Sequence, residues 1–268
     1  MPKHSLPLPE LQAEAARWAR QAGRIHMRYF RNPALEISHK GEIDLVTTAD
    51  KEAEAFLIAE IERAHPNHGY VAEEGHVKST AGGLAWYIDP LDGTTNFAHG
   101  YPVFSVSIAL VENGRALVGA VYDPNRDEMF TAVRGGGAAL NGKPVRVSAQ
   151  DGLRKAFLVS GFPYDFAGDP RNLRLWGAFL HAAQSVRRDG SAALDLCYVA
   201  AGRFDGFWEY GLHSWDIAAG ALVIEEAGGR ATNFDGSPLS LDGRAILATN
   251  TKLHAAMQAV LKENGAIT

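Results

Sequence analysis

The sequence has very little cysteine and no long apolar run. Its one cysteine, Cys197, lies in an apolar segment, so no disulfide can form within the chain, and a lone thiol of this kind is more often a small core residue than a nucleophile. No apolar stretch approaches the roughly 18 residues that a membrane span needs, and residues 1–9 contain no apolar signal-like core. These absences predict a cytoplasmic protein in a reducing compartment, with no membrane partner.

An excess of basic residues is also lacking. Lys and Arg number 26 against 31 Asp and Glu, which gives a formal net charge of -5. Direct nucleic-acid binding normally needs a basic stripe, so we expect no direct nucleic-acid partner. What the chain does have is length and apolar content. Its 268 residues, 46% of them hydrophobic, can build a single large α/β domain, which we divide into halves at residues 1–144 and 145–268.

Helical and extended patterns alternate along the chain. Apolar residues at three- and four-residue spacing predict helices over residues 9–29, 48–64, 171–185, 191–201, 215–227 and 252–263. Short apolar or alternating runs predict strands over residues 35–40, 69–72, 84–88, 103–111, 116–122, 128–133, 156–161, 204–210, 230–234 and 245–248. Asn113-Gly114 and Asn141-Gly142 predict hairpins, and Arg134-Gly135-Gly136-Gly137 is interpreted as a turn because the third glycine of a dinucleotide fingerprint is missing.

Two carboxylates follow directly after the predicted strand at residues 84–88. Asp89 stands at the strand end, and Pro90 is expected to take the chain out of the sheet so that Asp92 turns back toward Asp89. Gly93 lets a ligand approach the backbone, and residues 94–96 are of helix-capping types, whose N–H groups suit an anion. Acids for cations beside donors for an oxyanion indicate phosphate ester chemistry. The same residues also suit a solvated β-turn.

Other acids recur where predicted elements begin or end. Glu73-Glu74 follows the strand at residues 69–72, and we interpret Glu74 as part of a solvated turn. Asp50 falls in the first turn of a helix capped by Thr47 or Thr48, where the helix dipole alone favours a carboxylate. Asp216 lies at the N-terminus of the predicted helix at residues 215–227, and it is either a helix cap or a metal ligand.

Two segments together carry a family resemblance. Asp89-Pro90-Leu91-Asp92-Gly93-Thr94-Thr95-Asn96-Phe97 and Trp215-Asp216-Ile217-Ala218-Ala219-Gly220 resemble the two signatures of the inositol monophosphatase family. Further similarities are Asp44-Leu45-Val46-Thr47 before Asp50, Glu73-Glu74, Asn141-Gly142, Gly190-Ser191-Ala192-Ala193 and Glu209, over about residues 11–248. The resemblance implies a layered αβαβα sandwich of the inositol monophosphatase and fructose-1,6-bisphosphatase type, Mg²⁺ dependence, lithium sensitivity and homodimerisation.

The resemblance also implies a set of metal ligands. Glu73, Asp89 and the Leu91 carbonyl would hold a first Mg²⁺, and Asp89, Asp92 and Asp216 a second. Carboxylate and carbonyl oxygens are the ligands that Mg²⁺ prefers. A bridging Asp89 would place the ions roughly 4 Å apart, as in two-metal phosphate ester hydrolysis.

The resemblance implies catalytic and phosphate-binding roles as well. Glu73 and Thr94, with Asp50 behind Thr94, would orient the attacking water, and the Gly93 and Thr94 N–H groups would bind phosphoryl oxygens. Lys40 receives no role, because it stands one residue closer to Asp44 than the lysine common in the family.

The leaving-group pocket leaves the substrate open. By resemblance Gly190, Ser191, Ala192 and Glu209 line it, with Glu209 accepting hydrogen bonds from substrate hydroxyls. Our first hypothesis is a Mg²⁺-dependent phosphomonoesterase that acts on myo-inositol monophosphate, a small-molecule substrate. Histidinol phosphate or another small phosphate ester is the alternative, since Glu209 would also pair with an amine. A different class remains: some bacterial relatives bind the transcription and ribosomal RNA machinery.

Overall fold

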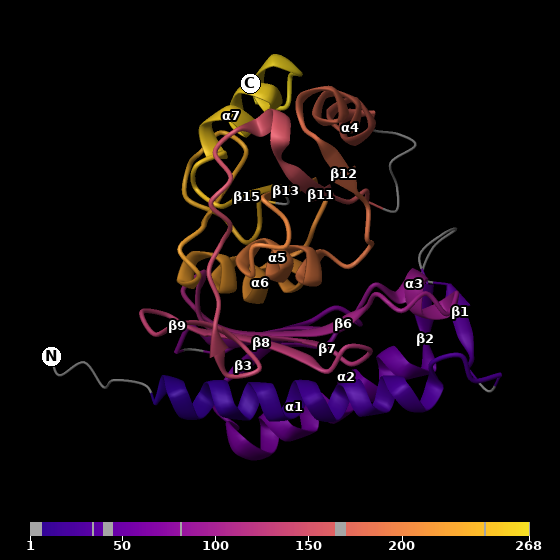
Figure 1. Cartoon of the computed structure of the whole chain (residues 1–268). Helices are drawn as coiled ribbons and strands as arrows, with labels where there is room; N and C mark the ends of the chain where they lie inside the picture. The colour runs from indigo at the N-terminus through magenta and orange to yellow at the C-terminus, as the bar shows by residue number, and fades with distance from the viewer. Residues whose placement is uncertain are drawn as a thin grey trace, which may run out of the picture.

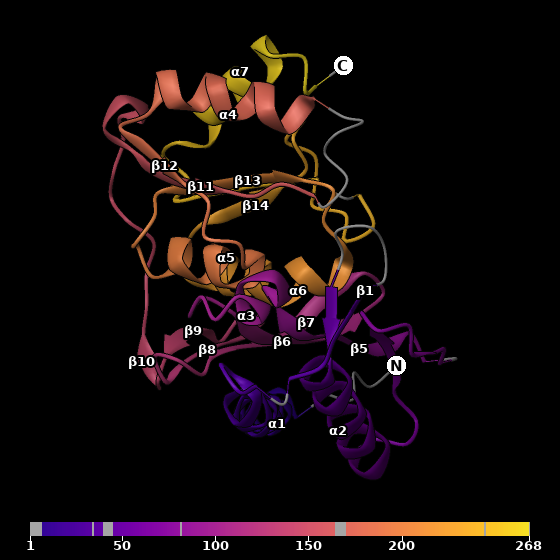
Figure 2. The ribbon, with the colours of Figure 1, turned by 90° about the vertical axis from the view of Figure 1, so that its right-hand side faces the viewer.

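The molecule is built of five stacked layers. The computed structural model describes residues 7–33, 35–39, 45–80, 82–163, 170–243 and 245–267. Figures 1 and 2 show helices, a sheet, helices, a second sheet and helices, one above the other. The predicted αβαβα sandwich is therefore confirmed. Lys40, Gly41 and Asp44 lie outside the described residues.

An eight-stranded sheet forms the lower half. Its strands lie in the order β10-β9-β8-β7-β6-β5-β3-β4. Their bounds are β3 (Gly69–Ala72), β4 (Val77–Lys78), β5 (Leu84–Asp92), β6 (Ser105–Glu112), β7 (Arg115–Asp123), β8 (Glu128–Val133), β9 (Gly137–Leu140) and β10 (Lys143–Pro144). The meander β6-β7-β8 and the turns at Asn113-Gly114 and Asn141-Gly142 are as predicted, because these four residues adopt the positive φ that such turns need.

Two helices cover the outer face of this sheet (Figure 1). They are α1 (Leu8–Tyr29) and α2 (Thr48–Ala64), and the short ladder of β1 (Ile37–His39) and β2 (Leu45–Thr47) lies beside them. The buried face of α1 holds Trp18, whose ring meets that of Trp86 on β5 edge-on at 5.3 Å between centroids. The aromatic pair fixes the helix on the sheet.

A five-stranded sheet forms the upper half, in the order β12-β11-β13-β15-β14. The elements here are η1 (Leu153–Lys155), β11 (Phe157–Ser160), β12 (Ser185–Arg187), β13 (Gly206–Tyr210), β14 (Arg230–Thr232) and β15 (Ala245–Thr249), with α4 (Arg171–Ala182) and α7 (His254–Glu263) outside. The predicted helix at 171–185 is too long. It ends at Ala182, because Ser185, Val186 and Arg187 pair with β11 as a parallel strand.

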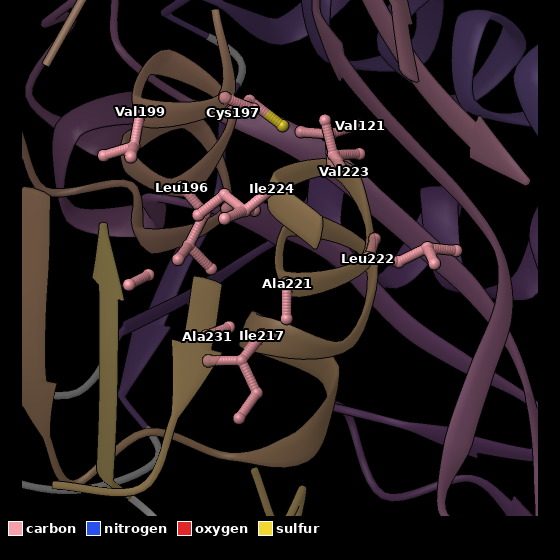
Figure 3. Packing of buried hydrophobic residues seen from close by; sticks show 14 of the residues in the cluster. Val121, Leu196, Cys197, Val199, Ile217, Ala221, Leu222, Val223, Ile224 and Ala231 are labelled. Carbon is pink, nitrogen blue, oxygen red and sulfur yellow. The ribbon is translucent and has the colours of Figure 1, made fainter. Parts of the chain in front are cut away.

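Between the sheets lie α5 (Ala192–Ala200) and α6 (Ser214–Glu226), most of whose residues are buried. Figure 3 shows apolar side chains of both helices, among them Leu196 and Val199 of α5 and Ile217 and Ile224 of α6. Small residues allow close packing here. A Cβ at Gly220 would stand 2.6 Å from the Leu196 Cβ, and one at Gly119 of β7 would stand 3.0 Å from the Ala219 carbonyl oxygen. The first turn of α5 meets the end of β5, where the Ala192 and Ala193 N–H groups donate to Asp92. No helix among the described residues is long and apolar enough to cross a membrane.

Candidate metal centre

Strand β5 carries its two aspartates into the sheet. We predicted that the strand ends before Asp89, which is wrong: it runs to Asp92, with a bulge between Asp89 and Asp92. Pro90 lacks an N–H to give to the ladder, and a bulge is where a sheet tolerates this. Asp89 is 2% exposed, and its Oδ1 accepts the Leu91 N–H at 3.0 Å. The bulge thus brings both carboxylates to one edge of the sheet.

Asp92 joins the two halves of the chain. Its Oδ2 accepts the Ala193 N–H at 2.9 Å and the Ser191 hydroxyl, and its Oδ1 accepts the Ala192 N–H at 3.2 Å. The Ser105 hydroxyl stands 3.4 Å from Oδ2. Burial raises the pKa of Asp92, and the bonds from Ser191 and the two amides oppose the rise. Ser191 stands at the N-cap position of α5, but its side chain donates to Asp92 and forms no hydrogen bond with the backbone of the helix.

Asp50 acts in two places at once. It accepts the Thr47 N–H at 2.8 Å as part of the capping box of α2, and its Oδ1 lies 3.0 Å from the Thr94 hydroxyl. The same hydroxyl lies 2.9 Å from the Leu91 carbonyl oxygen. Since Thr94 has one proton to donate, its oxygen keeps lone pairs for another donor. The helix-cap and site interpretations of Asp50 are therefore compatible.

Gly93 has a geometric reason to be glycine. Its φ is +93°, and a Cβ there would stand 3.0 Å from the Val103 carbonyl oxygen and 3.1 Å from that of Gly190. The short helix α3 (Thr94–Ala98) follows directly. Gly93 and Thr94 both line a cavity that Asp89 and Asp92 also line, and the family resemblance implies that their N–H groups bind phosphoryl oxygens.

Glu73 and Asp216 reach the same cavity from two other elements. The strands β3 and β5 are parallel, and Ala72 pairs with Ile88. The next residues, Glu73 and Asp89, therefore lie side by side at the same end of the sheet. Asp216 stands in the first turn of α6 and accepts the His213 N–H at 2.7 Å. Asp216 thus caps the helix and also faces the other acids.

The four carboxylates repel one another. Burial raises the pKa of Asp89 well above its usual range, and the charges of Glu73, Asp92 and Asp216 add to the rise. Burial likewise raises the pKa of Asp216. A divalent cation would relieve both effects, and an all-oxygen donor set suits a hard ion such as Mg²⁺. In their present positions, the described His, Cys, Asp and Glu side chains include no group of three or more that could hold a metal ion.

The cavity, of about 820 Å³, extends from these acids toward Glu209 on β13. Glu209 is 5% exposed, and burial raises its pKa to about 8, with Arg188 opposing the rise. A Cβ at Gly161 would stand 2.3 Å and 2.4 Å from the two Glu209 oxygens. Gly190, Ser191 and Ala192 also line the cavity, as the sequence predicts.

Several lining or supporting residues escaped the sequence analysis. Ser105 holds Asp92, and Gly161 makes room for Glu209. Arg188 and Asp195 line the pocket beside Glu209. Nothing local marks them, because each contact joins segments far apart in the chain.

Comparison with known proteins identifies the family. The model of the inositol monophosphatase family matches residues 8–266. An inositol-1-monophosphatase from Synechocystis is 47% identical over 229 residues, 84% of this chain and 80% of that protein. A protein named Nus factor SuhB from Pseudomonas aeruginosa is 44% identical over 250 residues, 91% of this chain and 92% of that protein.

Solved structures agree. That of an inositol monophosphatase from Anabaena has a TM-score of 0.88 at 40% identity, covering 96% of this chain and 97% of that one. A suhB protein from Bartonella henselae has a TM-score of 0.91 at 39% identity, covering 95% of this chain and 99% of that one. The fold, the two motifs at the carboxylate cluster and these similarities agree in one assignment, and the chain belongs to the inositol monophosphatase family.

Proposed function

We propose that the chain is a Mg²⁺-dependent phosphomonoesterase that hydrolyses inositol monophosphate to inositol and phosphate. One observation carries this: Glu73 after β3, Asp89 and Asp92 on β5 and Asp216 on α6 all line one cavity, which Gly93 and Thr94 also line. Membership of the inositol monophosphatase family supports the reaction class.

The ligand set follows from the cluster. The carboxylates of Glu73, Asp89, Asp92 and Asp216 and the Leu91 carbonyl would hold the Mg²⁺. When bound, Mg²⁺ supplies Lewis-acid stabilisation of phosphoryl charge and lowers the pKa of water. The Leu91 carbonyl oxygen points toward Thr94, whose hydroxyl lies 2.9 Å from it.

The attacking water would be oriented by two side chains of the protein. The Thr94 oxygen, held by Asp50 and the Leu91 carbonyl, has lone pairs for a water proton. Glu73, partly exposed to the cavity, would accept the other proton as general base. The Gly93 and Thr94 N–H groups would bind the phosphoryl oxygens, where donors are most effective because the site is shielded from water.

The leaving group would lie between Glu209 and the start of α5. Burial raises the pKa of Glu209 to about 8, so this carboxyl gains a proton more readily than an exposed one does. In either protonation state its oxygens can form hydrogen bonds with the hydroxyls of a cyclitol. Gly190, Ser191 and Ala192 would line the other side.

Three further properties belong to the same proposal. The family membership supports lithium sensitivity and a homodimer, and the single buried cysteine supports a cytoplasmic location. Phosphate-release assays with added LiCl and sedimentation of the purified chain test the first two.

A second function has a specific observation in its favour. Relatives about 44% identical over nine-tenths of this chain are named Nus factor SuhB. A role in which the chain binds a protein of the transcription machinery is therefore the alternative, and it requires no basic surface.

The deciding experiment is Mg²⁺-dependent phosphate release over a panel of inositol 1-phosphate, histidinol phosphate, fructose 1,6-bisphosphate, adenosine 3′,5′-bisphosphate and NADP, with Asp92→Asn as blank. A preference for inositol 1-phosphate supports the proposal, and a preference for another ester moves the substrate assignment. No metal-dependent release from any of them contradicts hydrolysis and favours the binding role.

A further inference from the structure

Helix α2 carries a second buried carboxylate, one turn after Asp50. Glu54 is only 1% exposed. Residues four apart lie on one face of a helix, so Glu54 and Asp50 point to the same side of α2. A buried carboxylate is stable only where donors satisfy its oxygens. The donors that Glu54 finds decide what this face of the helix does.

Both donors come from the turn between β3 and β4. Glu54 Oε2 accepts the Glu74 N–H at 2.9 Å, and Oε1 lies 2.6 Å from Nδ1 of His76. Within the turn, the Gly75 N–H donates to the Ala72 carbonyl at 3.2 Å, and the Ala72 N–H donates to the His76 carbonyl at 3.0 Å. Glu54 thus fixes the turn at residues 72–76 from outside. The turn is more than the solvated loop that its sequence indicates.

The turn also carries Glu73. One rigid helix therefore supports two parts of the site: Asp50 holds Thr94 at 3.0 Å, and Glu54 holds the turn that begins with Glu73. Asp50 and Glu54, one helical turn apart, thus connect Thr94 and the turn at residues 72–76 to the same helix.

We propose that Glu54 is a positioning residue of the site, which keeps the Glu73 carboxylate at a fixed place relative to Thr94 by holding the turn at residues 72–76. The inference rests on the proposed function, in which Glu73 and Thr94 orient the water and Glu73 is a Mg²⁺ ligand. Groups that orient metal ligands typically contribute 10- to 100-fold to metal affinity or activity, on the order seen for outer-shell partners.

The test compares Glu54→Gln with a matched control on the same helix. Glutamine has one acceptor oxygen, which can take the Glu74 N–H, and its NH₂ group then meets Nδ1 of His76. That contact is lost when Nδ1 carries the proton, and it is kept only when the ring takes the other tautomer. The control is Glu62→Gln. Glu62 accepts a 3.1 Å hydrogen bond from the hydroxyl of Tyr70, which lies on β3, the strand that precedes Glu73. Readouts are Mg²⁺ affinity by calorimetry, kcat and KM.

We expect Glu54→Gln to weaken Mg²⁺ binding by about 10- to 100-fold and to lower kcat by a similar factor, with KM changed less than about twofold. Glu62→Gln should match the parent protein. His76→Ala, at a side chain 65% exposed and therefore safe for folding, should weaken Mg²⁺ binding in the same direction but less.

Each other outcome is decisive. Parental Mg²⁺ affinity and kcat in Glu54→Gln overturn the proposal, as do equal losses in both glutamine variants that follow a fall in melting temperature. If Glu54→Gln does not fold, unchanged Mg²⁺ binding in His76→Ala overturns it. A parent protein that binds Mg²⁺ but releases no phosphate refutes the proposed hydrolysis, while the affinity comparison still decides the role of Glu54.

Discussion

Replacing Asp92 by asparagine should damage activity and stability together, because this side chain has two roles. The carboxylate accepts backbone N–H groups on both of its oxygens, from Ala192 on Oδ1 and from Ala193 on Oδ2. An asparagine has only one acceptor oxygen, so in either orientation its NH₂ group faces an N–H. The sequence alone gives the expectation that the fold stays intact, and the structure adds a cost.

The size of that cost follows from the bonds, and it is reduced by the relief of repulsion among the four carboxylates, which Asp92→Asn shares with Asp216→Asn. Leaving a buried donor unsatisfied costs about 1–3 kcal/mol. In a chain of this size each kcal/mol lowers the melting temperature by about 2–4 °C. Loss of a ligand charge should also lower turnover by at least about 100-fold, the upper end of the range for outer-shell partners. Melting is measured in EDTA, so that metal binding does not contribute.

Asp216→Asn is the matched comparison. Asp216 accepts one N–H, from the exposed His213, which an amide oxygen can still accept. Removing one of four mutually repelling carboxylates should leave stability unchanged or raise it, while turnover is lost as in Asp92→Asn. Near-parental activity in either variant would refute the metal-ligand assignment. An equal fall in melting temperature in both would refute the assignment of the Asp92 bonds.

Three further variants, at Gly161, Glu209 and His26, change residues that are not proposed metal ligands. Gly161→Ala should push the Glu209 carboxylate aside by about 1 Å, and because a displacement of this size can lower the reaction rate about 100-fold, it should weaken the preference for inositol 1-phosphate. Glu209→Gln, assayed on the same substrate panel, should change the ranking of the substrates while phosphate release in general persists. An unchanged ranking in both variants would remove Glu209 from the pocket. Burial lowers the pKa of His26 from the ordinary 6.5 to about 3. Between these two pH values the unfolded chain binds a proton at His26 that the folded chain does not bind. The free energy of unfolding therefore decreases as the pH falls from about 6.5 toward 3, by up to about 1.4 kcal/mol per pH unit. Urea unfolding between about pH 7 and pH 5 should show a shallower pH slope for His26→Leu than for the parent protein, and identical slopes would contradict this contribution.

The sequence predicts most of the elements, because helices and strands follow local periodicity. Hairpins at Asn113-Gly114 and Asn141-Gly142 need a positive φ that few residues tolerate, so their turn residues are diagnostic. The short strand Ser185–Arg187 was missed because no residue in it is diagnostic of a strand. A three-residue strand between β11 and solvent has no period of its own, and only its parallel partner defines it.

The site was predictable to the extent that its residues lie in two short motifs. What the motifs do not contain is the support behind them. Asp92 is bound by a helix start a hundred residues later in the chain, so its bonds cannot be inferred from the residues beside it. The bulge at Pro90 was read as a strand end, because a proline stops a regular ladder and a bulge leaves no separate signal in sequence.

Charge patterns mislead most where a charge is buried. Asp50 and Glu54 both lie on a helix rich in charged residues, and a carboxylate there normally indicates a solvated face or the helix dipole. Burial of such a group becomes favourable only when another segment brings donors to it, and here those are Thr47 and Thr94 for Asp50 and the turn at residues 72–76 for Glu54. A helix that carries no proposed metal ligand can therefore still determine where the ligands stand, because its buried acids form hydrogen bonds with the loops that hold them.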